Sequence, residues 1–222
     1  MKLKLTNIKL AVVIITALLI VDQILKIWIK THFQLGESYS IANWFQISFI
    51  ENPGMAFGMN FGGEIGKLFL SLFRIALVTF IGIQLYKLSK KSVPKGVIVG
   101  LSLILAGAAG NIFDSMFYGL IFSESTPFQV ATFMPEGSGY ASFLHGKVVD
   151  MFYFPIIDTT WPSWVPFVGG TDFVFFRPIF NIADASISIG IFYLFLFQRK
   201  YFTTKKHEAK TTETESDTTV SD

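Results

Sequence analysis

The sequence predicts an all-α integral membrane protein with four transmembrane helices, both termini in the cytoplasm, and a small outer-facing β element among long extracytoplasmic loops. The chain of 222 residues is 51% hydrophobic and has a mean hydropathy of +0.52. Its apolar residues gather in four segments of about the ~20 residues that cross a ~30 Å hydrocarbon core. Most of its basic residues stand at one set of segment ends, which sets the orientation.

The four apolar segments are interpreted as membrane spans, at about residues 8–29, 67–88, 93–113 and 178–197. The first is not a cleavable signal peptide, because its apolar stretch continues into Asp22-Gln-Ile-Leu-Lys26 without a small-residue exit. We expect one four-helix membrane domain over residues 1–202. Residues 203–222 are rich in Thr, Glu and Lys, a composition that predicts a disordered cytoplasmic tail.

Lysine and arginine determine the predicted orientation. Twelve of the 18 basic residues lie at or just beyond one set of span ends, namely the start of the first span, the junction of the second and third spans, and the end of the fourth. They are Lys2, Lys4, Lys9, Lys87, Lys90, Lys91, Lys95, Arg199, Lys200, Lys205, Lys206 and Lys210. The positive-inside rule therefore places both termini in the cytoplasm and residues 30–66 and 114–177 on the outer side.

The two outer segments differ in composition. Residues 41–50 (IANWFQISFI) alternate and are rich in aromatic side chains, which predicts a strand, and Asn52-Pro-Gly54 then predicts a turn. The second outer segment is aromatic and interrupted by Pro and Gly, as in Trp161-Pro-Ser-Trp164. This composition is typical of structure at the level of the lipid headgroups.

Composition excludes several classes of function. A net charge of +2 leaves no basic surface for nucleic acid once the lysines that flank the membrane are set aside. The absence of cysteine excludes disulfides, thiolate metal sites and cysteine nucleophiles. The three histidines form no HExxH motif, so a zinc protease is not expected.

Four aspartates are candidates for the functional site. Asp22, Asp114 and Asp184 stand at or inside the outer ends of apolar segments, and Asp150 lies in the second outer segment. A carboxylate in hydrocarbon costs roughly 2.5–3.5 kcal/mol even on the translocon scale, so such residues are functional candidates by default. A rise of ~1.5 Å per residue puts the three intramembrane aspartates in the outer third of the membrane, where Asp150 can join them.

Two carboxylates that share a site offer an acid and a base together, because both cannot ionise easily. This is the chemistry that an aspartic peptidase needs. Asn111 and Asn181 each precede an aspartate by three residues, so each shares a helix face with its aspartate, Asp114 or Asp184. Their amides are placed to orient a carboxylate or to bind a peptide backbone. Transporters also bury carboxylates, so proximity alone is a weak signal.

Five short motifs occur in a fixed order along the chain. They are Asp22-Gln-Ile-Leu-Lys26, Asn52-Pro-Gly-Met-Ala-Phe57, Gly107-Ala-Ala-Gly-Asn-Ile-Phe-Asp114, His145-Gly-Lys-Val-Val-Asp150 and Phe180-Asn-Ile-Ala-Asp184. With these motifs on this topology, the chain resembles the lipoprotein signal peptidases (signal peptidase II), the membrane aspartic endopeptidases that remove signal peptides from prolipoproteins. Each motif alone is weak, whereas the five together are highly specific.

The resemblance implies that Asp150 and Asp184 form the catalytic dyad. It assigns dyad support, substrate binding or access to the remaining motif residues, namely Asn52, Gly54, Asn111, Asp114, Asn181, Asp22 and Lys26. It further implies a bacterial cytoplasmic (inner) membrane enzyme with its site at the periplasmic or outer face. The implied substrate is a prolipoprotein cleaved just before a cysteine that carries diacylglycerol. We expect membrane lipid around the chain, no metal or cofactor, and a monomer.

Two departures from the family pattern stand out. The family usually has Arg after the aspartate of the Gly-Asn-x-x-Asp motif, and this chain has Ser115, so Lys147 or Arg177 is the expected substitute. The outer loops 115–145 and 151–178 are also longer than the family norm, and we expect additional outer structure there. The Val-Val-Asp and Phe-Asn-x-Ala-Asp signatures are intact, so the placement of the dyad does not change.

Alternatives remain open for several of these features. Asp22 and Lys26 have the i,i+4 spacing of a helical ion pair, so a structural role and a substrate contact are equally weighted. Asp114 is favoured as a support residue over a direct catalytic one. The alternative to a peptidase is a proton-coupled membrane carrier or channel that uses intramembrane carboxylates. A Ser/Lys peptidase built on Ser142 and Lys147 ranks lower still.

Overall fold

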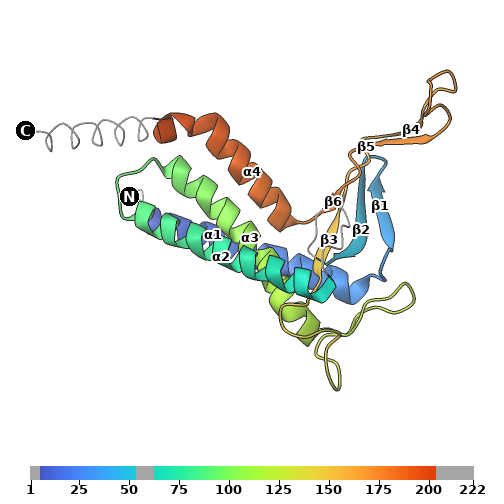
Figure 1. The fold of residues 1–222 in the computed structure, drawn as a ribbon, viewed down its shortest axis with the longest axis horizontal. Helices are drawn as coiled ribbons and strands as arrows, with labels where there is room; N and C mark the ends of the chain where they lie inside the picture. Colours follow the sequence, from blue (N-terminus) through green and yellow to red (C-terminus); the bar gives the residue numbers. More distant parts are fainter. Residues whose placement is uncertain (1–5, 54–62, 204–222) are drawn as a thin grey trace, which may run out of the picture.

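The computed structural model describes residues 6–53 and 63–203. The elements in chain order are α1 (Asn7–His32), β1 (Ser38–Ala42), β2 (Phe45–Asn52), α2 (Gly63–Ser89), α3 (Lys95–Ile121), β3 (Val148–Tyr153), β4 (Ile157–Thr160), β5 (Asp172–Phe175), β6 (Ile179–Phe180) and α4 (Ile182–Phe197). Within these described residues, three helices are long and apolar enough to cross a membrane, and α4 is a shorter apolar helix. Figure 1 shows the helices gathered on one side and the strands at their common end. The fold is therefore not purely all-α, because two antiparallel sheets stand at that end.

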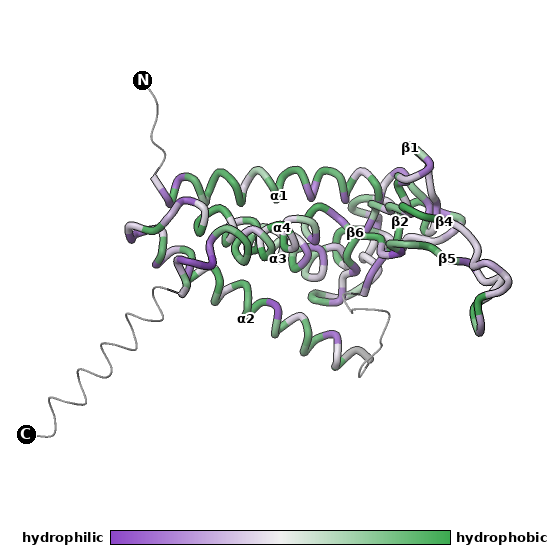
Figure 2. Tube along the Cα trace, turned by 90° about the horizontal axis from the view of Figure 1, so that it is seen from above, coloured by the Kyte–Doolittle hydropathy of each residue, from purple (hydrophilic) through white to green (hydrophobic). Residues whose placement is uncertain are grey.

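Hydrophobic residues occupy most of the length of the helices (Figure 2). In α1 and in α2, 11% of the most apolar stretch of the helix is buried inside the protein, whereas the corresponding share in α3 is 44%. The exposed aliphatic and aromatic side chains of α1 and α2 therefore suit lipid rather than water. By contrast, α3 is the central helix of the bundle, and it packs against α1, α2 and α4.

Helix α3 continues eight residues beyond the predicted end of its span at residue 113 and ends at Ile121. Asp114 and Ser115 do not end the helix, because both are buried and their polar groups are bonded inside the protein. Asp114 therefore lies within a helix, whereas the sequence placed it at the outer end of one.

Helix α4 begins at Ile182, four residues later than the predicted span, because residues 179–180 form the short strand β6 and Asn181 caps the helix. Glycines let α4 approach α3 closely. A Cβ at Gly190 would stand 2.8 Å from the Gly100 carbonyl oxygen, and a Cβ at Gly107 would overlap the Ala183 carbonyl. The first turn of α4 therefore rests directly on α3.

The four-stranded sheet has the order β1-β2-β3-β6, with antiparallel pairs throughout. The single strand predicted over residues 41–50 is wrong, because a turn at Asn43-Trp44 folds this stretch into the hairpin of β1 and β2. On β3, Asp150 pairs with Ile50 of β2. A core of six buried side chains joins this sheet to α1 and α3; it consists of Ile29, Phe49, Tyr118, Phe122, Val149 and Met151.

The strands β4 and β5 form a separate two-stranded hairpin within the long loop 151–178. Figure 1 shows this hairpin projecting beyond the sheet, on the side of the molecule where α4 lies. In the predicted tail, Thr203 still belongs to a helical turn, with its hydroxyl donating to the Arg199 carbonyl at 3.0 Å. Residues 204–222 lie outside the described residues, as does Gly54.

Candidate active site

Asn181 connects the two aspartates that the sequence singles out as a pair. Its Nδ2 donates to Asp150 Oδ1 at 2.7 Å and to the Val149 carbonyl at 3.2 Å. Its Oδ1 accepts the Asp184 backbone N–H at 2.9 Å, and Asp184 Oδ2 accepts the Asn181 backbone N–H at 3.4 Å. The reciprocal pair is a capping box at the start of α4. One fully buried amide thus holds a sheet carboxylate beside the first turn of a helix.

Asp184 is also held from α3. Asn111 Nδ2 donates to Asp184 Oδ1 at 2.8 Å, and Asn111 Oδ1 accepts Asn181 Nδ2 at 3.2 Å. The two asparagines are therefore hydrogen-bonded to each other, and each donates to one carboxylate: Asn111 to Asp184 and Asn181 to Asp150. This differs from the pairing expected from the sequence, because Asn111 contacts Asp184 rather than Asp114.

Asp150 is 4% exposed and stands at the centre of the sheet. Burial, followed by the nearby charge of Asp184, raises the pKa of Asp150 from 3.8 to about 7. Hydrogen bonds from Asn52 and Asn181 and the charge of Lys26 act in the opposite direction but are outweighed. Asn52 Nδ2 donates to Asp150 Oδ2 at 3.4 Å from the end of β2. Such a carboxyl can keep its proton near neutral pH while its neighbour is ionised, which is the arrangement of an acid–base pair.

Behind this pair, Lys26 forms ion pairs with the two remaining aspartates. Its Nζ lies 2.9 Å from Asp22 Oδ2 and 2.8 Å from Asp114 Oδ2, and it donates to Asn111 Oδ1 at 2.8 Å. All three charged side chains are at least 97% buried. The contacts therefore favour a structural ion pair for Asp22 and Lys26, and they place Asp114 in the same ion-paired cluster.

Two members of this network were missed in the sequence. Gln23 Nε2 donates to Asp114 Oδ1 at 2.8 Å, and Gln23 Oε1 accepts the Tyr118 hydroxyl at 3.0 Å. Asp22 Oδ1 also accepts the Ala183 backbone N–H at 3.0 Å, so α1 helps to cap α4. Gln23 lies inside the first motif, and its amide within an apolar span was the signal that could have identified it.

A second buried network lies between α1, β2 and the outer loops. Glu51 forms ion pairs with Lys30 and with Lys147, the latter at 3.1 Å, and it accepts a hydrogen bond from Ser125 at 2.9 Å. Lys147 also reaches Glu124 at 3.7 Å. The charges of Lys30 and Glu51 inside apolar surroundings were the signals in the sequence.

These contacts argue against the expected substitutes for the family arginine. Lys147 is occupied by Glu51, and Arg177 donates to the Asp172 carbonyl at 3.4 Å, so both cations contact groups other than the aspartate pair. The Ser142 hydroxyl contacts His145 Nδ1 at 3.1 Å. The Ser/Lys arrangement of Ser142 with Lys147 is therefore not favoured.

No group of three or more His, Asp or Glu side chains within residues 6–53 and 63–203 is placed to hold a metal ion. The four aspartates considered above are separated by Lys26 and the asparagine amides instead.

Comparison with known proteins identifies the family. The model of the family described as Signal peptidase (SPase) II matches residues 14–199. The chain is 54% identical over 187 residues to the lipoprotein signal peptidase of Porphyromonas gingivalis, covering 84% of this chain and 81% of the relative. It is 36% identical over 184 residues to that of Amoebophilus asiaticus (81% and 73%) and 32% identical over 188 residues to that of Lactococcus lactis (84% and 91%).

The chain belongs to the signal peptidase II family. It is thus an aspartic endopeptidase and a multi-pass membrane protein. The fold is also that of a solved bacterial membrane enzyme determined by the in meso method, with a TM-score of 0.56 and 23% identity over 88% of this chain and 90% of that one. A second such structure has a TM-score of 0.52 and 24% identity over 84% and 90%.

In this signal peptidase II chain, a cavity of about 420 Å³ opens between α2, α3 and α4. Aliphatic side chains of the three helices form most of its wall, among them Leu77, Val78, Ile104, Ile187 and Ile191. Its polar lining is Arg74, Asn111 and Asp184. The cavity therefore connects an apolar groove at membrane depth with one of the two paired aspartates.

Proposed function

We propose that Asp150 and Asp184 are the catalytic dyad and that the scissile bond lies just before a cysteine that already carries diacylglycerol. The activity itself, removal of signal peptides from prolipoproteins, is that of the lipoprotein signal peptidases to which this chain is 54% and 36% identical. The observation that supports the assignment most directly is Asn181, which bonds Asp150 and Asp184 at once. Asp22 and Asp114 instead form ion pairs with Lys26.

The mechanism begins with one proton shared by the pair. The ionised carboxylate accepts a proton from a water molecule, whose oxygen attacks the peptide carbonyl. The protonated carboxyl gives its proton to the carbonyl oxygen, forming a tetrahedral diol. When the C–N bond breaks, a proton returns to the amine of the modified cysteine and the carboxyl group of the signal peptide is released. The raised pKa of Asp150 favours it as the holder of the proton, although the dyad titrates as a unit.

The amides have roles in this mechanism that follow from their bonds. Asn181 and Asn111 each donate to one carboxylate, so they fix the two oxygen pairs relative to each other before substrate arrives. Asn52, at the open end of β2, stands on the approach to Asp150. Gly54 remains a proposed part of that approach.

The cavity between α2, α3 and α4 suits the apolar part of such a substrate. Its aliphatic wall offers burial to an apolar helix or to acyl chains, and Asp184 lies at its polar end. A lipid-anchored cysteine would hold the scissile bond at that depth. The alternative, a proton-coupled carrier, requires carboxylates spread across the membrane, whereas these four aspartates meet in one hydrogen-bonded cluster.

The topology that accompanies this function has four crossings. We place α4 in the membrane as the fourth, with both termini cytoplasmic and the sheet, hairpin and dyad at the periplasmic or outer face of a bacterial inner membrane. Residues 1–202 then form one peptidase domain and the remaining residues a cytoplasmic tail. A site completed within one chain supports a monomer.

The decisive experiment is cleavage of a purified diacylglyceryl-modified precursor by the wild type and by Asp150→Asn and Asp184→Asn. Each substitution removes an ionisable group and retains shape, so both variants should fold and lose cleavage. Asp158→Asn is the matched control, because Asp158 is an exposed outer-side aspartate on β4, and it should cleave normally. Thermal unfolding in detergent verifies that each variant is folded. Full activity of either dyad variant would refute the assignment and make Asp114 the next residue to test.

A further inference from the structure

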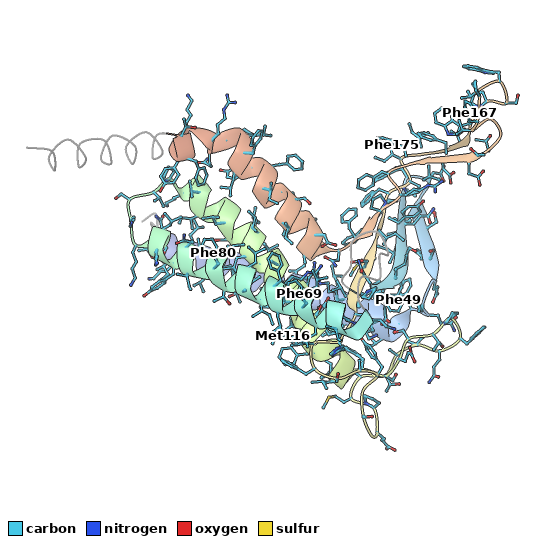
Figure 3. All side chains as sticks on the ribbon, viewed as in Figure 1. Phe49, Phe69, Phe80, Met116, Phe167 and Phe175 are labelled. Carbon is cyan, nitrogen blue, oxygen red and sulfur yellow. The ribbon has the colours of Figure 1, made fainter. Side chains whose placement is uncertain are left out.

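The hairpin β4–β5 presents large apolar side chains that contribute little to the fold. At its tip, Phe167 is 104% exposed and Trp164 is 80% exposed, and Phe175 near its base is 52% exposed. Figure 3 shows Phe167 at the far end of the hairpin and Phe175 closer to the sheet. Aromatic side chains of this size are normally buried, so full exposure indicates a surface that meets another apolar phase.

The tip is built rigidly enough to hold these side chains outward. Trp161 and Thr171 close it through a backbone bond of 2.9 Å, and the Trp161 ring packs against Phe173 in a tilted arrangement with ring centroids 4.8 Å apart. Phe167 has a positive φ of 68°, a left-handed conformation that is unfavourable for a bulky residue. An unfavourable backbone that displays an exposed aromatic ring is expected where the display itself has a function.

The depth of the hairpin base points to lipid. Helix α4 has 16 residues and rises about 24 Å, which is short of a ~30 Å hydrocarbon core. The inner end of α4 is level with that of α3, because Gln198 lies beside Gly96. Phe176, the residue that follows β5, is only six residues before Ile182, where α4 starts, so the base of the hairpin stands near the outer hydrocarbon boundary.

Composition and continuity agree with this placement. Between Ile156 and Phe176 the only charged residues are Asp158 and Asp172. The aromatic surface continues from the hairpin base across the sheet, where Phe154 stacks on Phe180 at 5.7 Å and on Trp44 at 6.2 Å. Trp and Phe next to Pro and Gly, without basic residues, suit the interface of a bilayer irrespective of headgroup charge.

We propose that the β4–β5 hairpin is a membrane-interface anchor, with Trp164 and Phe167 inserted among the lipids of the outer leaflet beside the bundle. The hairpin thereby fixes the sheet, and with it Asp150, at the lipid surface. This inference concerns the position of the outer structure and does not depend on which aspartates are catalytic.

The test places the full chain in proteoliposomes with Trp164 as the only tryptophan, the other three (Trp28, Trp44 and Trp161) being replaced by Phe. Lipids brominated at shallow or deep acyl positions quench a tryptophan that contacts them, and acrylamide quenches one in water. We expect loss of Trp164 emission with the shallow bromolipid, protection from acrylamide, and the same result in zwitterionic and anionic vesicles. A variant with only Trp28, which is 47% exposed on α1, is the positive control.

Quenching by acrylamide without quenching by either bromolipid would overturn the anchor and would leave a protein partner as the remaining occupant. Quenching only in anionic vesicles would also contradict it, because the segment has no basic residue to explain such dependence. If the triple substitution impairs folding, an environment-sensitive fluorophore attached to Phe167→Cys in this cysteine-free chain reports lipid or water contact in its place.

A different observation concerns Arg74 in the middle of α2. It stands 15 residues before the inner end of α2, and Asp184 stands 13 residues before the inner end of α4, so both lie roughly 20 Å above those ends. Arg74 lines the apolar cavity together with Asn111 and Asp184. An ionisable residue at this depth that faces a cavity is a candidate functional residue.

From this placement we infer that Arg74 binds the substrate, donating to a peptide or ester carbonyl next to the scissile bond. A guanidinium offers several donors in a fixed plane, and apart from Asn111 and Asp184 the cavity around it is aliphatic, so the carbonyl oxygens of a substrate held there are complementary groups. This inference rests on the proposed function and adds a specificity-determining residue to it.

Arg74→Gln should raise KM for the diacylglyceryl precursor about tenfold, the loss of one charge-assisted hydrogen bond, and leave kcat and its pH profile nearly unchanged. Arg74→Lys should raise KM less. Unchanged KM, or a shifted pH profile with unchanged KM, would overturn substrate binding by Arg74. The Asp184→Asn result separates the two proposals, because full cleavage by that variant refutes the dyad whatever Arg74 does.

Discussion

The Nδ2 of Asn181 lies 2.7 Å from Oδ1 of Asp150, although the two residues belong to a helix cap and a strand. The same side chain caps α4 through the Asp184 backbone N–H. One residue therefore determines where α4 begins and which way the Asp150 carboxylate points. Its substitution should affect stability and cleavage by two separable routes.

Asn181→Ala removes both the cap and the bond to Asp150. We expect lower stability by about 1 kcal/mol from the cap, and a further loss because the buried Asp150 oxygen is left unpaired. Asn181→Ser retains a capping hydroxyl but is too short to reach Asp150, so it should regain thermal stability without regaining cleavage. Equal recovery of stability and cleavage in the serine variant would contradict this division. Thermal unfolding and precursor cleavage, measured on the same preparations, decide it.

The raised pKa of Asp150 predicts an alkaline limit to activity. Because the folded protein holds this proton to a pKa of about 7, the singly protonated dyad is present below that pH and is lost above it. The ratio kcat/KM should therefore fall as the pH rises through 7. The same group makes the folded state less stable as pH rises from 3.8 to about 7, since the folded state binds the proton more tightly than the unfolded state.

Asn52→Ala tests the cause of this limit. The Asn52 hydrogen bond favours the ionised form of Asp150, so its removal should move the alkaline limb to higher pH. The measurement is the pH profile of kcat/KM for the two proteins. A limb that moves to lower pH, or stays in place, would show that another group sets it.

Much of the architecture could be predicted from the sequence. The four apolar segments predict four helices, because the length and hydropathy of a segment are enough to identify an apolar helix. The five motifs predict the family and the residues that gather at the site. The helix ends could not be placed in this way. Asp114 and Ser115 resemble a helix end in the sequence, yet Lys26, Gln23 and the Asn111 carbonyl satisfy them, so α3 continues.

Contacts between segments far apart in the sequence were the hardest feature to predict from the sequence. The bonds from Asn181 to Asp150 and from Asp22 to Ala183 span 31 and 161 residues, and no local pattern encodes them. Likewise, the alternation of residues 41–50 is compatible with one strand or two, and the turn at Asn43-Trp44 is chosen because both strands then pair in the same sheet.

Lys26 is predicted to be more important for folding than for chemistry. Lys26→Met would leave Asp22 and Asp114 buried without their cation, and breaking a buried ion pair in this way typically costs about 3–5 kcal/mol. We expect little folded protein from this variant. Lys87→Met, at an exposed position near the inner end of α2, is the control and should behave like the wild type. A folded Lys26→Met protein with normal unfolding temperature but no cleavage would instead make Lys26 a residue of the reaction.

Gly107 should be essential for the position of Asp184, because a methyl group there would overlap the carbonyl of Ala183, the residue next to Asp184. Gly107→Ala forces α4 away from α3, and overpacking of this kind costs about 1–3 kcal/mol. Cleavage should fall more than stability, since even a small shift of α4 separates Asp184 from Asn111. Gly82→Ala is the matched control on α2, where the added methyl would stand 3.9 Å from Leu105 and nothing need move. Normal cleavage by Gly107→Ala would show that α4 can shift without loss of the site.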